Sequence, residues 1–115
     1  MGRGRSLNGL LTHNERQALD ELRSLLAARC EPLRITLIGS KARGNSDAES
    51  DIDVVLVLRR LDSRLQTEVF EMCFDISLRN DVLLQPVLYS EKEFKSPLTR
   101  ATPFYQAVIA EGIQL

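Results

Sequence analysis

The chain has 115 residues, of which 43% are hydrophobic and 27% charged, the composition of an ordinary globular domain. Its net charge of −1, its aromatic content of 5% and its lack of Trp argue against a surface that binds nucleic acid. No apolar run approaches the roughly 20 residues that span a bilayer, and no apolar segment follows the basic N-terminus to make a secretory signal. We therefore expect one cytoplasmic domain over residues 1–115, with a flexible tail at residues 1–8 and no membrane contact.

The two cysteines, Cys30 and Cys73, lie far apart in the sequence and have no CxxC spacing. Each lies in or beside an apolar segment, where free Cys behaves as a small hydrophobic residue. We expect two buried free thiols, which fits a reducing compartment.

The first predicted helix opens at a capping box. Thr12 as N-cap and Glu15 at N3 have the spacing at which each side chain binds the backbone N–H of the other. Leucines then recur at helical spacing, and the helix should end near Arg29, before Pro32. The alternating, β-branched segment at residues 33–38 predicts a strand.

The next segment combines a glycine turn with a second strand. Gly39 and Ser40 end the first strand, residues 41–43 are expected to form a short helix, and Gly44 should stop it. A polar loop then leads to the second strand, residues 50–58.

Two aspartates at the start of this second strand are the strongest chemical signal in the chain. Residues i and i+2 of a strand share a face, so Asp51 and Asp53 should project side by side. Like charges so close repel each other unless a cation or hydrogen bonds compensate. Mg²⁺ prefers carboxylate and phosphate oxygens. The pair therefore predicts a divalent-cation site that serves phosphate chemistry.

A second helix and a third strand follow. Ser63 and Gln66 have the spacing of another capping box, which predicts a helix to about Leu78. Residues 82–89 then read as a strand that carries Pro86. Because proline cannot donate to a ladder, this strand should lie at an edge of the sheet.

The last part of the chain is predicted to contain a short helical turn and a helix over residues 104–111. Ser90 and Glu93 have the spacing of a capping box and start the short turn. Thr102 as N-cap and Pro103 at the first helical position start the helix, and Gly112 should end it at C′. The apolar residues of the last helix are Phe104, Val108 and Ile109, which we expect in the core, although this face could instead dock a partner or a second copy of the chain. The order α-β-α-β-α-β-α predicts an α/β (α+β) fold, with a small mixed β-sheet flanked by helices.

The glycine turn could bind a phosphate. Gly39 has no Cβ, so a ligand can approach its backbone closely, and Ser40 adds a hydroxyl. Arg43 is a bidentate donor suited to phosphate oxygens, and Lys41 could contribute a point charge. Together with the two aspartates, the turn predicts a site for a triphosphate bridged by Mg²⁺.

Residues 39–44 (GSKARG) and 50–53 (SDID) resemble the signature of the DNA polymerase β-type nucleotidyltransferase superfamily. Within it, the chain is most similar to the minimal nucleotidyltransferases (MNT) of prokaryotes. The resemblance implies the nucleotidyltransferase fold and the Mg²⁺-dependent transfer of a nucleoside monophosphate, usually AMP from ATP, to a hydroxyl. It implies that Gly39 and Ser40 hold the β- and γ-phosphates, assisted by Arg43, and that Asp51 and Asp53 bind the metal ions and carry the catalysis.

The resemblance also implies a partner. Such proteins typically pair with a helical HEPN protein in toxin–antitoxin systems, where the nucleotidyltransferase is the antitoxin and can modify the toxin. The acceptor hydroxyl would then come from that partner, or from a second copy of this chain in a homodimer, since 115 residues leave no room for an acceptor-binding domain.

The third carboxylate of the family pattern falls on Gln85. An amide cannot accept a proton as a general base. The missing group could come from Asp81, water or the acceptor, and Asp75 is a weaker candidate. Two hypotheses follow: an active nucleotidyltransferase, or a catalytically degenerate module that binds and neutralises a partner without chemistry.

Overall fold

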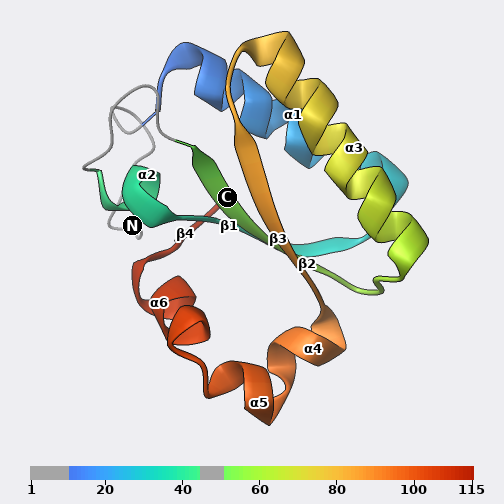
Figure 1. Cartoon of the computed structure of the whole chain (residues 1–115), viewed down its shortest axis with the longest axis vertical. Helices are drawn as coiled ribbons and strands as arrows, with labels where there is room; N and C mark the ends of the chain where they lie inside the picture. The colour runs from blue at the N-terminus through green and yellow to red at the C-terminus, as the bar shows by residue number, and fades with distance from the viewer. Residues whose placement is uncertain (1–10, 45–50) are drawn as a thin grey trace.

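The computed structural model describes residues 11–44 and 51–115 of the chain. The expected tail at residues 1–8, the polar loop and the motif residue Ser50 lie outside this part. Figure 1 shows the elements, which are α1 (His13–Arg29), β1 (Pro32–Ile38), α2 (Gly39–Arg43), β2 (Ile52–Leu58), α3 (Ser63–Asn80), β3 (Leu84–Ser90), α4 (Glu91–Lys95), α5 (Pro97–Arg100), α6 (Pro103–Glu111) and β4 (Ile113–Gln114). In this described part, no helix has the length and apolar character needed to cross a membrane.

The strands of the described residues form one mixed sheet in the order β3-β2-β1-β4. Strand β1 is antiparallel to both of its neighbours, whereas β2 and β3 are parallel. The prediction that Pro86 marks an edge strand is confirmed, because β3 pairs only with β2 in the sheet order. Strand β4 is missing from the sequence prediction. It has only two residues and exists through its pairing with Thr36 and Leu37 of β1.

The two faces of the sheet are covered by different helices. Helices α1 and α3 pack side by side on one face (Figure 1). The residues of β2 that point toward them are fully buried: Ile52, Val54, Leu56 and Leu58. On the opposite face, Val55 and Val57 pack with Phe94 of α4 and Val108 of α6. Asp53 lies on that same face but is only half-buried.

Side-chain caps define most helix starts. The capping boxes at Thr12 and Ser90 are confirmed, each with the reciprocal side-chain contact of its N3 glutamate. The predicted box at Ser63 is wrong by one residue, because Asp62 is the N-cap of α3. Its Oδ1 accepts a hydrogen bond from the Leu65 N–H at 2.8 Å. A carboxylate at this position also interacts favourably with the helix dipole, which a hydroxyl does less well.

Gly112 ends α6 for a different reason than predicted. Its φ is −68°, so it does not use the left-handed conformation that makes glycine a common C′ residue. A Cβ at this position would instead collide with the Thr36 side chain and the Val108 carbonyl oxygen. Glycine is required because the chain passes close to β1 on its way into β4.

The apolar face of α6 is only partly in the core. Val108 is buried, but Phe104 is 39% exposed and Ile109 is 48% exposed. The expectation that all three pack inside is therefore wrong for two of them. A short amphipathic helix buries one stripe of side chains, and Val108 is the residue of α6 that joins the buried cluster with Val55, Val57 and Phe94.

Both cysteines are free thiols, as expected. Cys73 of α3 is buried in the core, whereas Cys30 is half-buried at the end of α1, so the expectation of burial is confirmed for Cys73 and wrong for Cys30. Burial raises the pKa of the Cys73 thiol to about 11.

Candidate functional site

The two aspartates lie at the start of β2, between two neighbouring strands. Asp51 directly precedes the strand and Asp53 is its second residue. In the sheet register, Asp53 lies opposite Ile38 at the end of β1 and beside Gln85 on β3. Asp53 therefore lies where the central strand β1 ends and the central strand β2 begins, directly beside the turn that follows β1.

Gly39 brings the turn against the Asp53 carboxylate. Its φ is +77°, a conformation that residues with a Cβ rarely adopt. A Cβ on Gly39 would lie 2.6 Å from Asp53 Oδ2, so the close approach also requires glycine. Ser40 follows in the first turn of α2 and is half-buried. The glycine turn and Asp53, which lie apart in the sequence, thus meet in space.

The side chain of Gln85 completes this group. Its Nε2 donates a hydrogen bond to Asp51 Oδ2, and its backbone is the register partner of Asp53. Position 85 is therefore where a third acidic side chain would face the other two. In the described residues, 11–44 and 51–115, no three His, Cys, Asp or Glu side chains gather closely enough to hold a metal ion.

The two other carboxylates considered from the sequence lie elsewhere. Asp81 lies before the third strand, as the C-cap of α3 in the left-handed conformation, with φ 55°. The strand begins only at Leu84. Asp75 is an exposed residue of α3 and lines a surface pocket with Arg29 and Glu68.

The electrostatics of the aspartate pair favour a bound cation. Burial raises the pKa of the Asp53 carboxyl, and the negative charge of Asp51 raises it further. Both causes act against the ionised form, and a cation between the carboxylates would offset both. Mg²⁺ is commonly held by one or two carboxylates together with substrate phosphates. The side chains present at this site fit that ion.

A pocket of about 330 Å³ extends from the turn across the sheet to α6. Its charged lining residues are Arg43, Asp53 and Glu111. Its apolar lining residues are Ile38, Val87, Phe104, Ala107 and Val108. Arg43 is half-exposed and its Nη1 lies 3.6 Å from Glu111 Oε1, an ion pair between α2 and α6 at the pocket wall. An exposed pair of this kind is weak, so a phosphate could compete for Arg43.

The family that matches this sequence is described as nucleotidyltransferase domain, and the match spans residues 15–109. The chain belongs to this nucleotidyltransferase family. The match includes the glycine turn, both aspartates and Gln85, so the geometry above lies within the family's own region.

Two relatives of the nucleotidyltransferase come from Methanocaldococcus jannaschii. One, named "Putative protein adenylyltransferase MJ0141", is 32% identical over 83 residues, which cover 71% of this chain and 77% of that protein. The other, "Putative protein adenylyltransferase MJ0604", is 31% identical over 101 residues, which cover 86% of this chain and 95% of that protein. A solved structure, "Crystal structure of the toxin-antitoxin with AMP-PNP", aligns with a TM-score of 0.60 and 23% identity, covering 83% of this chain and 69% of that one. At this identity, the likeness shows the shared fold.

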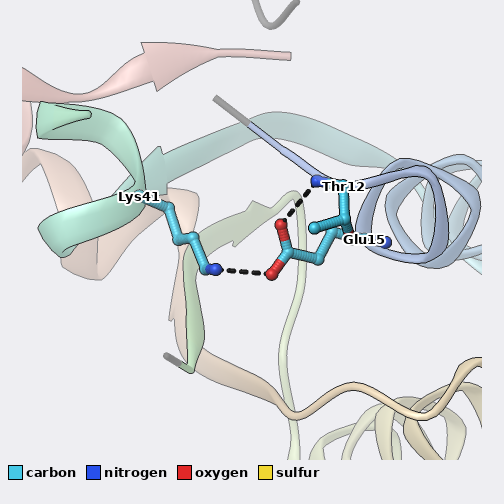
Figure 2. Close-up of polar contacts among 3 residues, drawn as sticks. All are labelled: Thr12, Glu15 and Lys41. Atoms are coloured by element: carbon cyan, nitrogen blue, oxygen red, sulfur yellow. Dashed lines mark hydrogen bonds and ion pairs between the residues drawn. The ribbon is translucent and has the colours of Figure 1, made fainter. Parts of the chain in front are cut away.

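Lys41 has a different environment from the one expected within the nucleotidyltransferase motif. Its side chain is buried and extends from α2 to Glu15 of α1, where Nζ forms an ion pair with Oε2 (Figure 2). It is therefore not exposed to a ligand at the turn, and the suggestion that it contributes a point charge to a phosphate is wrong. Of the two cationic residues in α2, only Arg43 lines the pocket.

Proposed function

We propose that this nucleotidyltransferase is a Mg²⁺-dependent enzyme that transfers AMP from ATP to a hydroxyl of a partner protein. The observation that carries the proposal is the convergence of Gly39 and Asp53, with Asp51 close enough to raise the pKa of the Asp53 carboxyl. A Gly-Ser turn alone is a common turn, and two aspartates alone are a common strand end. Here Gly39 and Asp53 line one pocket, and a glycine turn against a carboxylate pair is the arrangement that a metal-chelated triphosphate requires.

Each group has a defined task in this proposal. Asp51 and Asp53 would hold Mg²⁺, which when bound neutralises phosphate charge and activates the attacking oxygen. Gly39 and Ser40 receive the outer phosphates, and Arg43 exchanges its exposed partner Glu111 for a phosphate oxygen. The acceptor oxygen forms a bond to the α-phosphorus while the bond to pyrophosphate breaks. Gln85 cannot take up the hydroxyl proton, so the proton passes to water or to a base of the acceptor.

The pocket suggests how the nucleotide lies. It is charged at the β1 end, where Arg43 and Glu111 meet, and apolar near β3, where Val87 and Phe104 line it. Phe104 is seven residues before Glu111 on α6, a distance of roughly 10 Å along a helix. A nucleoside triphosphate has the same order of properties, from the charged phosphates through the ribose to the base. We place the base between Val87 and Phe104.

The acceptor is proposed to be a separate protein, and a HEPN-type helical toxin is the form that the family resemblance favours. The names of the two archaeal relatives refer to protein adenylylation, and the name of the structural neighbour refers to a toxin–antitoxin assembly and a nucleotide analogue. The same logic allows a second copy of this chain as acceptor, in a homodimer. Both arrangements fit a cytoplasmic protein.

The test is a transfer assay with the protein, Mg²⁺ and ATP labelled at the α-phosphate, with the product of the neighbouring reading frame as acceptor. Label should appear on the acceptor, and mass spectrometry should find one added nucleoside monophosphate. Asp53→Asn should reduce the rate by about 100-fold or more without lowering the melting temperature, because it removes a half-buried charge that Asp51 disfavours. No transfer from any of the four ribonucleotides, to the acceptor or to the chain itself, would refute an enzymatic role.

The second candidate is a nucleotidyltransferase-fold module that binds and neutralises a partner without chemistry. The amide of Gln85 at the third acidic position is the observation that favours it. Calorimetry with ATP and Mg²⁺ separates the two functions. Binding without turnover, together with neutralisation of the partner by the Asp53→Asn variant, would support the module, whereas turnover excludes it.

A further inference from the structure

A buried ion pair joins α2 to the N-terminus of α1, directly behind the Gly39–Ser40 turn. The side chains of Lys41 and Glu15 are 2% and 3% exposed, and Lys41 Nζ donates to Glu15 Oε2. The other carboxylate oxygen accepts a hydrogen bond from the Thr12 N–H at 2.8 Å. Figure 2 shows the result: one carboxylate bridges the first residues of α1 and the third residue of α2.

Stability alone is a poor explanation for this pair. Burying two charges removes them from water, and replacing such a pair by apolar side chains of similar volume is often neutral or stabilising. A charged, hydrogen-bonded pair instead provides direction, because its bonds form at only one relative arrangement of the two segments. The question is which arrangement needs to be fixed.

Helix α2 is the segment whose orientation has to be fixed by contacts with the rest of the protein. It has five residues, and its N-cap, Ile38, provides no side-chain hydrogen bond. A helix this short has almost no stability of its own, so tertiary contacts set its orientation. Besides the exposed Arg43–Glu111 pair, two consecutive buried side chains contribute such contacts, Lys41 and Ala42. Of the two, Lys41 can make the directional bond, and it is the residue next to Ser40.

We propose that Glu15 and Lys41 are positioning residues, whose ion pair sets the orientation of α2 and hence of Gly39 and Ser40 relative to Asp53. The inference rests on the proposed function, because the triphosphate is the ligand that this orientation serves. Neither residue contacts the nucleotide. The pair makes the start of α1 a structural part of the phosphate turn, although Glu15 and Lys41 are 26 residues apart.

The deciding variant is the double substitution Glu15→Leu with Lys41→Met. It replaces the pair by apolar side chains of similar size, and we expect a melting temperature close to that of the wild type. Lys41→Met alone leaves the Glu15 carboxylate buried without its ion-pair partner and should destabilise the protein. Glu15→Gln is a second variant that keeps the shape of the side chain and its contact with the Thr12 N–H.

Thr12→Ala is the matched control. It removes the hydroxyl that caps the Glu15 N–H, so it weakens the same end of α1. It leaves the backbone N–H that binds Glu15 and leaves the ion pair itself. An effect that comes from loss of the hydroxyl cap of α1 will therefore also appear in this control, and Glu15→Gln covers the Thr12 N–H contact that Glu15→Leu removes.

Two measurements test the positioning role. Amide hydrogen exchange at residues 41–44 should be about 10-fold faster in the double variant and in Glu15→Gln, and unchanged in Thr12→Ala. Calorimetric titration with Mg²⁺ and inorganic tripolyphosphate should give a dissociation constant about 10-fold higher for the same two variants. Wild-type exchange and affinity in a folded double variant would overturn the positioning role. If the wild type itself fails to bind tripolyphosphate, the proposed function fails, while the exchange rates still decide whether the pair orients α2.

Discussion

At the scale of single residues, Gln85 matters because a neutral amide stands where a third carboxylate would add a negative charge to the candidate site. It donates a hydrogen bond to Asp51 and lies beside Asp53 in the β2–β3 register. An amide in this position satisfies one aspartate and adds no further negative charge, so it favours the metal-free protein. A carboxylate would do the opposite, because it would repel both aspartates until a cation was bound.

Gln85→Asp should therefore have opposite effects with and without Mg²⁺. Without the ion, the third carboxylate should lower the melting temperature, since the variant loses a hydrogen bond and gains a like charge beside Asp51. With Mg²⁺ and ATP, we expect the transfer rate to rise by about 10-fold or more, because a positioned general base contributes at least that much. Melting curves and the labelled-ATP assay, each with and without Mg²⁺, measure both effects.

Gln85→Ala is the control for that experiment. It removes the hydrogen bond to Asp51 without adding a charge, so it should not raise the transfer rate. If Gln85→Asp is no faster than Gln85→Ala, position 85 is not the place where a third carboxylate acts.

Phe104 tests the placement of the base. It is 39% exposed and lines the pocket at the end where we place the nucleobase. Stacking of a base on an aromatic side chain is worth about 1–3 kcal/mol. Phe104→Ala should therefore weaken ATP binding about 10-fold and leave the affinity for Mg²⁺-tripolyphosphate unchanged, as calorimetry can measure. Equal losses for both ligands would mean that Phe104 shapes the pocket rather than contacting the base.

The aspartates and the glycine could be identified from sequence because their arrangement is local. A strand places residues i and i+2 on one face, and a turn directly before a short helix brings Gly39 to the end of β1. The burial of Lys41 could not be identified in this way. It depends on Glu15, a residue that the sequence marked only as part of a capping box, and nothing local shows that its carboxylate has a second partner.

At the scale of elements, Gly112 controls how α6 joins β4. A Cβ there would meet the Thr36 side chain on β1 and the carbonyl oxygen of Val108. Gly112→Ala should displace β4 from β1 and destabilise the protein by about 2–3 kcal/mol, the range for a substitution that overpacks a buried contact. Urea unfolding followed by circular dichroism measures the change.

Ala110→Ser, on the exposed side of the same helix, is the control for Gly112→Ala and should change stability by less than about 0.5 kcal/mol. A Gly112→Ala variant as stable as this control would mean that β4 adjusts without loss.

The elements that were predicted well have strong end signals, and those that were missed depend on tertiary contacts. The boxes at Thr12 and Ser90 define α1 and α4 from within four residues of sequence. The cap of α3 was shifted by one position because Asp62 and Ser63 are both good N-caps, and the choice depends on the carboxylate reaching the Leu65 N–H. Strand β4 has no signal of its own, since two residues form a strand only where a neighbour pairs with them.

At the scale of the whole molecule, the two faces of the sheet have separate roles. The face under α1 and α3 contains the larger buried cluster, in which Cys73 of α3 packs against the strands. The opposite face carries the smaller cluster around Val55 at one half and the candidate site around Asp53 at the other. Because the large cluster supplies most of the apolar burial, it should determine the global stability, while changes at the site should affect binding more than folding.

The ionisation of the Cys73 thiol makes the free energy of unfolding depend on pH, because the thiol is buried in the large cluster. Burial raises the pKa of its thiol from 9.0 in the unfolded chain to about 11 in the folded protein. Between these values the unfolded thiol ionises and the folded one does not, so the folded state binds more protons and its stability falls as the pH rises. The contribution of the neutral thiol is complete below pH 9 and is lost as the pH rises through 11.

The loss can be separated from other titrations by comparison with Cys73→Ala, which lacks the thiol. At pH 8 the variant should be less stable than the wild type, because it leaves a small cavity in the core. At pH 10 the wild type should have lost about 1.4 kcal/mol through the thiol, so the difference in unfolding free energy between the two proteins should shrink by that amount. Urea unfolding at both pH values measures it. A difference that stays constant from pH 8 to pH 10 would mean that Cys73 ionises in the folded protein as readily as in the unfolded chain, and hence that the core beneath α3 admits water.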